Sequence, residues 1–95
     1  IVVFTLEPKQ QQELVDAIVS EVERWVRHRP GFVSSNFHLS LDGTKVVNYA
    51  QWTTKEAWEG FTQDPESAVL SDKIKRVGVK PDGHSYKVYR AIEAS

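Results

Sequence analysis

The sequence predicts an α+β protein of the ferredoxin-like class, in which a β-α-β-β-α-β order builds a four-stranded antiparallel sheet with both helices on one face. Three observations predict it: a long amphipathic stretch after an apolar start, two alternating runs around Asp42-Gly43, and a second helical region before a final alternating run. Repeats and linkers are absent from the 95 residues, so we expect a single domain spanning residues 1–95.

The first strand and helix are indicated by an apolar run and a helical repeat. Residues 1–6 are mostly β-branched or aromatic, and Pro8 ends this strand and suits the first turn of a helix. From Lys9 to about His28, apolar residues recur every three or four positions, which predicts one long helix ended by Pro30-Gly31. Its buried stripe is expected to contain Leu14, Val15, Ile18, Val19, Val22, Trp25 and Val26.

The centre of the chain is predicted to be a β-hairpin. Residues 32–41 and 44–53 flank Asp42-Gly43, a strong signal for a two-residue turn. With that turn Leu41 faces Thr44 and paired positions sum to 85. The pairs expected on one face are Phe37 with Asn48, Ser35 with Ala50, and Val33 with Trp52.

The two faces of this hairpin differ in polarity. The more apolar face, expected to lie under the helices, carries Val33, Phe37, Leu39, Val46, Asn48 and Trp52. The other face carries Phe32, Ser34, Asn36, His38, Ser40, Val47, Tyr49 and Gln51. This second face is too apolar to stay hydrated and too polar for a monomer core, so we expect a homodimer that pairs sheet to sheet.

The second half of the chain is predicted to be two short helices and a strand. Thr53 to Glu56 has capping-box spacing before a helix with Trp58 and Phe61 on its inner side. Asp64 as cap, followed by Pro65, starts a further helical segment. Residues 78–83 are expected to form a loop and residues 85–92 the last strand.

Composition and motifs exclude several classes of function. Twelve basic and thirteen acidic residues give a net charge of -1, which disfavours nucleic acid and anionic membranes as partners. The sequence contains no cysteine, no metal-site histidine spacing and no glycine-rich nucleotide or dinucleotide loop, so we expect no metal and no cofactor. It has no apolar run long enough to cross a bilayer, and a cytoplasmic location is expected.

The stretch VVNYAQW, residues 46–52, places an asparagine on the apolar face of a strand. Asn48 shares this face with Ala50 and Trp52 because strand side chains alternate. A buried amide without a partner is destabilising by about 1–3 kcal/mol. Two interpretations are open: Asn48 bonds a backbone or helix group and fixes packing, or it lines a cavity and donates to a substrate oxygen. Trp52 is correspondingly either a core residue or a flat wall of that cavity.

Residues 30–61, PGFVSSNFHLSLDGTKVVNYAQWTTKEAWEGF, resemble the centre of the antibiotic biosynthesis monooxygenase family, and the expected elements match that family over essentially the whole chain. The Pro-Gly-Phe start, the Asp-Gly hairpin and the Asn-Tyr-x-x-Trp strand carry the resemblance. It implies a dimeric α+β barrel in which two ferredoxin-like protomers pack sheet against sheet. This agrees with the dimer expected from the sheet face.

One branch of this family oxidises aromatic polyketides, such as anthrones, to quinones with dioxygen and without metal, flavin or nicotinamide. The resemblance implies catalytic roles for Asn48 and Trp52, and for Arg76, which alternatively extends into water. A deprotonated electron-rich phenol can itself pass an electron to dioxygen, so the protein need only stabilise the anion and exclude water. The candidate substrate-binding residues are Ser35, Phe37, Trp58 and Phe61.

Three other functions are alternatives to this one. A haem-degrading branch uses a histidine of the second helical region and an asparagine of the first strand, and residues 57–77 and 1–6 lack them. A non-catalytic dimeric module that binds a small hydrophobic ligand stays open, as does a polyketide cyclase. We therefore predict a homodimeric, cofactor-independent monooxygenase that oxidises an aromatic phenol- or anthrone-like substrate, such as a polyketide, to a quinone with dioxygen.

Overall fold

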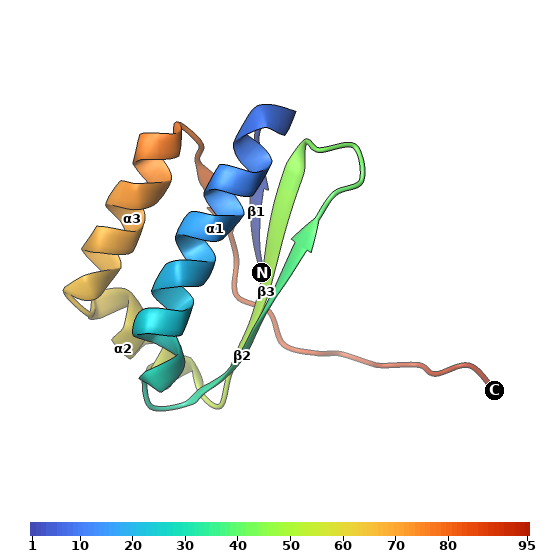
Figure 1. Ribbon diagram of the computed structural model, residues 1–95. Helices are drawn as coiled ribbons and strands as arrows, with labels where there is room; N and C mark the ends of the chain where they lie inside the picture. Colours follow the sequence, from blue (N-terminus) through green and yellow to red (C-terminus); the bar gives the residue numbers. More distant parts are fainter.

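The computed structural model describes residues 1–95, and three helices cover one face of a four-stranded antiparallel sheet of order β2-β3-β1-β4 (Figure 1). The elements in chain order are β1 (Val2–Thr5), α1 (Pro8–Arg24), the 3-10 turn η1 (Val26–His28), β2 (Phe32–Leu39), β3 (Lys45–Trp52), α2 (Lys55–Gln63), α3 (Glu66–Val77) and β4 (Pro81–Gly83). The ferredoxin-like α+β fold class predicted from the sequence is confirmed.

The first helix begins where expected and ends earlier. Pro8 is the first residue of α1, and the backbone N–H of Glu7 donates to Gln10 Oε1 at 3.0 Å. Trp25 leaves helical geometry, so the predicted single helix to His28 is divided into α1 and η1. This break turns the chain toward β2.

The hydrophobic core lies between α1 and the middle of the sheet. Seven buried residues form it: Phe4, Leu6, Leu14, Val15, Ile18, Val46 and Val79. Each such side chain contributes on the order of 1.5–3 kcal/mol through removal of apolar surface from water. Neither α2 nor α3 contains a fully buried residue, so these helices are held by partly buried side chains and polar contacts.

The register of the central hairpin is confirmed from Ser34 to Leu39 and is wrong at its open end. Phe37 pairs with Asn48 as expected, but a β-bulge between Phe32 and Ser34 places Phe32 opposite Trp52. The extra residue reverses the alternation, so Val33 turns outward and is 54% exposed. Phe32 therefore belongs to the helix-covered face and not, as predicted, to the bare one.

The hairpin turn is longer than the predicted two residues. β2 ends at Leu39 and β3 begins at Lys45, so Leu41 does not face Thr44 across a ladder. The carboxylate of Asp42 accepts hydrogen bonds from the backbone N–H and hydroxyl of Thr44, at 3.0 and 2.6 Å, and from Ser40 Oγ at 2.9 Å. These bonds, those from Thr44 above all, lower the pKa of Asp42 to about 2.

The two short helices each begin one residue later than predicted. Thr54, not Thr53, caps α2, and its hydroxyl accepts from the backbone N–H of Ala57 at 3.1 Å. The carboxylate of Asp64 accepts from the N–H of Glu66 at 2.9 Å, so α3 starts at Glu66. A threonine and an aspartate, the residue types expected at these helix starts, therefore accept the first backbone N–H groups there.

The last strand is not where the sequence predicts it. β4 is Pro81–Gly83, inside the expected loop, whereas residues 85–92 form no strand and extend away as an exposed tail (Figure 1). Gly78 turns the chain with φ of 90° and Val79 is buried, so residue 81 already lies beside β1. The pairing ends at Val2 with Gly83, and beyond His84 no strand of this chain lies alongside.

The bare face of the sheet is joined by side-chain hydrogen bonds. Ser34 Oγ donates to Gln51 Oε1 at 3.0 Å, and Asn36 Nδ2 donates to Ser34 Oγ at 3.1 Å. Gln51 Nε2 donates to Tyr49 Oη, also at 3.0 Å. Val47, also on this face, is only partly buried, so the face remains the mixture of apolar and polar groups that the sequence predicts.

Candidate functional site

The helix-covered face of β2 and β3 brings together four of the seven residues singled out by the sequence. β3 contributes Asn48 and Trp52, separated by the small side chain of Ala50. On β2, Phe37 lies beside Asn48 and Ser35 lies beside Ala50. Ser35 and Ala50, a pair of small side chains in the middle of the face, thus leave room between the larger side chains on either side.

The amide of Asn48 has no hydrogen-bond partner. Its Oδ1 is buried, and neither a backbone group nor a polar side chain of a helix reaches it. Such a group is destabilising by about 1–3 kcal/mol, and buried amides in folded proteins are normally paired. The packing interpretation expected a partner within the protein, and none reaches Oδ1.

Trp52 forms part of an aromatic stack. Its ring lies 5.4 Å from that of Phe32 in an edge-to-face arrangement at 83°, and 5.3 Å from that of Phe61, which is stacked at 24°. Phe61 contacts Trp25 on its other side at 5.6 Å. The stack holds Trp52 in one orientation, and Trp58 on α2, 36% exposed, lies outside it.

A cavity of about 300 Å³ opens between α1 and β2, and we call it the α1–β2 cavity. Ser35 and Phe37, both predicted to bind substrate, line it. The other lining residues are Val19, Val22, Glu23, Arg27, Phe32 and Ser34. Asn48 and Trp52 do not line it, but each pairs with a lining residue, Phe37 and Phe32 respectively. The α1 residues of this lining were not predicted from the sequence, because an amphipathic stripe does not show which of its edges stays uncovered in the folded protein.

A second cavity, of about 340 Å³, lies between α2 and the segment that connects η1 to β2. Phe61 lines it, together with Arg29, Pro30, Glu56, Ala57, Gly60 and Asp64. Arg29 Nε and Asp64 Oδ2 form an ion pair at 2.8 Å across it. The two cavities therefore lie on either side of the aromatic stack, since Phe32 lines the first and Phe61 the second.

Comparison with known proteins identifies the family. Residues 1–71 match the antibiotic biosynthesis monooxygenase family. The chain belongs to this family.

Two characterised relatives come from Streptomyces. The chain is 49% identical over 63 residues to the tetracenomycin-F1 monooxygenase of Streptomyces glaucescens, an alignment that covers 66% of this chain and 56% of that protein. It is 35% identical to the monooxygenase ActVA-Orf6 of Streptomyces coelicolor, whose structure holds the ligand nanaomycin D. That likeness has a TM-score of 0.80 and covers 99% of this chain and 89% of the other.

A more distant structure agrees in fold. SnoaB of Streptomyces nogalater, described as a cofactor-independent oxygenase, is 17% identical with a TM-score of 0.66 over 95% of this chain and 93% of its own. At that identity the likeness shows the fold alone. The prediction from the sequence that the chain belongs to this monooxygenase family is confirmed.

The arginine that the family resemblance suggested lies on α3, whereas the other two catalytic candidates lie on β3. Arg76 is exposed on α3, makes no hydrogen bond or ion pair, and lines neither cavity. One turn earlier, Lys73 points back across the helix layer to Glu21. In this family member, therefore, the structure brings Asn48 and Trp52 onto one face and leaves Arg76 apart from them.

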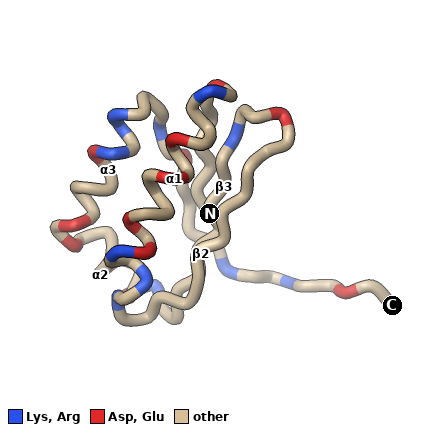
Figure 2. Tube along the Cα trace, in the orientation of Figure 1, with Lys and Arg blue, Asp and Glu red and all other residues tan.

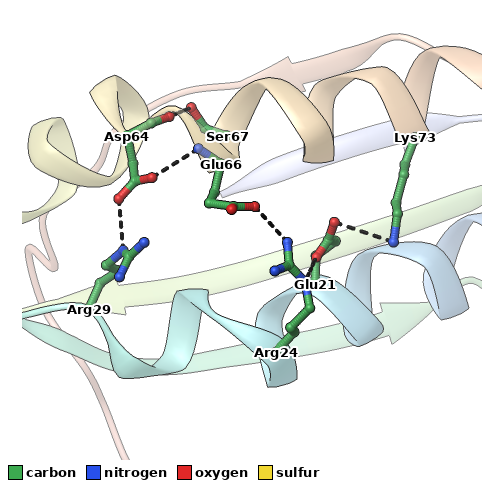
Figure 3. Close-up of polar contacts among 7 residues, drawn as sticks. All are labelled: Glu21, Arg24, Arg29, Asp64, Glu66, Ser67 and Lys73. Atoms are coloured by element: carbon green, nitrogen blue, oxygen red, sulfur yellow. Dashed lines mark hydrogen bonds and ion pairs between the residues drawn. The ribbon is translucent and has the colours of Figure 1, made fainter.

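The helix layer above the sheet contains a buried carboxylate that the sequence analysis missed (Figure 3). Glu21, with 0% exposure, accepts a hydrogen bond from Arg24 Nε at 2.8 Å and forms an ion pair with Lys73 Nζ at 3.3 Å. Arg24 also donates to Glu66 on α3 at 2.6 Å. The hydrogen bond from Arg24 is the main cause of the lowered pKa of Glu21, and Lys73 adds to it while burial opposes both.

Neither a metal-binding group of histidines and acidic side chains nor a helix long and apolar enough to cross a membrane is present.

The interior polar groups next to the aromatic stack are the amide of Asn48 and the indole N–H of Trp25, whose Nε1 is also buried without a partner. A hydroxyl of an aromatic molecule could donate to Asn48 Oδ1, and a carbonyl or hydroxyl oxygen could accept from the indole N–H of Trp25.

Proposed function

We propose that this family member is a cofactor-independent monooxygenase that oxidises a phenol- or anthrone-like aromatic substrate, of the polyketide type, to a quinone with dioxygen. The observation that carries the proposal is the buried, unpaired amide oxygen of Asn48, next to Phe37 of an aromatic-walled cavity. The names of the two Streptomyces relatives, and the nanaomycin D bound to one of them, support a polyketide-derived substrate.

The proposed chemistry uses the substrate as its own reductant. A phenol or anthrone loses a proton, and the resulting anion passes an electron to dioxygen; the radical pair combines to a peroxide at the ring carbon. Loss of water from this peroxide leaves the new carbonyl, so one oxygen atom enters the product and the other leaves as water with two substrate hydrogens. The protein has to stabilise the anion and exclude solvent.

Asn48 and Trp52 receive separate roles in this proposal. The amide of Asn48 donates from Nδ2 to the substrate oxygen on which negative charge develops, and Oδ1 accepts from a neighbouring hydroxyl. Trp52, fixed by its stacking on Phe61, positions the substrate ring through Phe32, which it contacts edge-to-face and which lines the cavity. Ser35 and Phe37 contact the substrate from β2 in the α1–β2 cavity.

The assembly proposed for this enzyme is a dimer built through the bare face of the sheet. Val47 and Tyr49 lie there among hydrogen-bonded polar side chains and are only partly buried. A second copy would cover this face without disturbing the cavities, which lie on the helix side. The partner proposed is thus another copy of this chain.

Oxygen uptake by metal-free and flavin-free protein, with a panel of anthrones, naphthols and hydroquinones, tests the function. We expect uptake above the autoxidation rate for the wild type and none above it for Asn48→Ala. Gln12→Ala, which removes an exposed amide on α1, should retain full uptake. Arg76→Ala should have a smaller effect than Asn48→Ala because Arg76 is exposed on α3, whereas Asn48 lies on the helix-covered sheet face with a buried Oδ1. Ligand binding without uptake by any variant would instead favour a non-catalytic binding module.

A further inference from the structure

The mouth of the α1–β2 cavity carries two charged residues that the proposed chemistry does not use. Glu23 on α1 and Arg27 in η1 both line the cavity and both are exposed. Their spacing of four residues favours an ion pair along a helix, but α1 ends between them at Arg24 and no ion pair joins them. Both side chains are therefore available to a bound molecule.

Basic residues follow one another where α1 ends (Figure 2), and among Arg24, Arg27 and Arg29 only Arg27 makes no ion pair. Arg24, three residues earlier, is held by Glu21 and Glu66 at 2.8 and 2.6 Å. Arg29, two residues later, is held by Asp64 at 2.8 Å, as Figure 3 shows. Glu66 of α3 and Asp64, between α2 and α3, thus engage the neighbouring guanidinium groups, whereas Arg27 makes no ion pair.

The inner part of the same cavity is apolar and aromatic. Phe32 and Phe37 form its sheet side, and Val19 and Val22 its helix side. Its volume of about 300 Å³ is at the small end of the range found for ligand sites. Such a space suits a planar aromatic ring system with its polar substituent at the mouth, where Arg27 lies.

We infer that Arg27 recognises an anionic oxygen on the aromatic substrate, supplied by a carboxylate or by an ionised phenol. The planar guanidinium can donate two hydrogen bonds to such a group, and the apolar walls hold the rings behind it. Glu23, on the same rim, accepts from a hydroxyl and disfavours a second anionic substituent. The inference rests on the proposed function for the identity of the site and goes beyond it by naming the group that selects the substrate.

A structural role for Arg27 has to be separated from recognition, because a cation near the end of a helix is stabilising by itself. Binding of hydroxynaphthoate, of its neutral carboxamide and of naphthol to the full chain can be measured by calorimetry without oxygen. The variants are Arg27→Gln, Arg27→Lys and the matched control Lys9→Gln, which removes an exposed positive charge at the other end of α1.

We expect the wild type to bind hydroxynaphthoate about tenfold more tightly than the carboxamide, with the preference weakened by added salt. Arg27→Gln should abolish this preference while naphthol affinity and melting temperature stay unchanged, Arg27→Lys should restore part of it, and Lys9→Gln should keep it. Raising the pH through the pKa of naphthol shows whether a phenolate serves as well as a carboxylate. Wild-type protein that does not bind hydroxynaphthoate, or does not prefer it, overturns the inference, as does an Arg27→Gln variant that retains the preference.

The failure of this inference is distinguishable from failure of the proposed function. Oxygen uptake that depends on Asn48, together with an unchanged preference in Arg27→Gln, would retain the oxygenase and reject the role of Arg27. A preference that depends on Arg27, in a protein without oxygen uptake, would retain an anion-selective aromatic site and reject the oxygenase.

Discussion

Glu21 on α1 lies fully buried 3.3 Å from Lys73 on α3, and Arg24 completes its environment from the other side. The side chains of its two basic partners, Arg24 and Lys73, are themselves partly exposed, at 52% and 37%. This contact joins α3, which has no fully buried residue of its own, to the helix that carries most of the core.

Glu21→Gln should therefore lower the free energy of unfolding, by about 1–3 kcal/mol, because it removes charge-assisted contacts from a covered position. Since the folded state lowers the pKa of Glu21, this stabilisation is fully present above the pKa of the unfolded chain, about 4.3. It is lost as the pH falls through the lower, folded pKa. Urea unfolding of wild type and variant should thus differ at neutral pH and converge in acid. The exposed Glu13→Gln is the control, and an equal loss in that variant would contradict the assignment.

Asn48→Leu should separate catalysis from stability. Replacing an unpaired buried amide by an apolar group of similar shape removes a destabilising term, so the free energy of unfolding should stay equal or rise by about 1 kcal/mol. Oxygen uptake should be abolished. Chemical denaturation and oxygen electrode measurements on the same preparation check both effects. A clearly destabilised Asn48→Leu variant would show that the amide is a packing group.

Phe61→Leu tests whether the aromatic stack positions Trp52. The variant loses ring contacts to both Trp52 and Trp25, each worth about 0.5–1.5 kcal/mol, and should lower both stability and turnover. Near-ultraviolet circular dichroism should report the change in the tryptophan environment. Tyr89→Leu, which removes a ring that is 91% exposed, is the control. If turnover in Phe61→Leu is unaltered, the orientation of Trp52 by this stack plays no part in the proposed mechanism.

Val47→Glu should disrupt the proposed dimer, because it places a charge in the centre of the bare sheet face. Light scattering should then give the mass of a single chain, while the wild type gives twice that mass. Ser20→Glu, at an exposed position of α1 on the other side of the molecule, should leave the dimer intact. A dimer that persists in Val47→Glu would place the interface elsewhere.

The sequence predicted those features that depend on local pattern. The apolar stripe of α1, the hairpin around Asp42 and the alternation through Asn48 each follow from a repeat that a few residues define. The family resemblance came from the same central segment, and the match over residues 1–71 confirms it. The sequence did not determine which candidate residues lie on the same element face: Asn48 and Trp52 share a face of β3, whereas Arg76 is exposed on α3.

The features that only the tertiary structure decided depend on contacts between elements far apart in the chain. The bulge at Val33 moved Phe32 to the covered face, and burial of Val79 drew Pro81 to Gly83 alongside β1 and left residues 85–92 without a partner strand. Likewise, Arg24 and Arg29 are engaged by carboxylates of distant segments, while Arg27 is free at a cavity. Periodicity specifies which face of an element is apolar, but the packing of whole elements specifies which polar groups are left without partners, and those groups define the site.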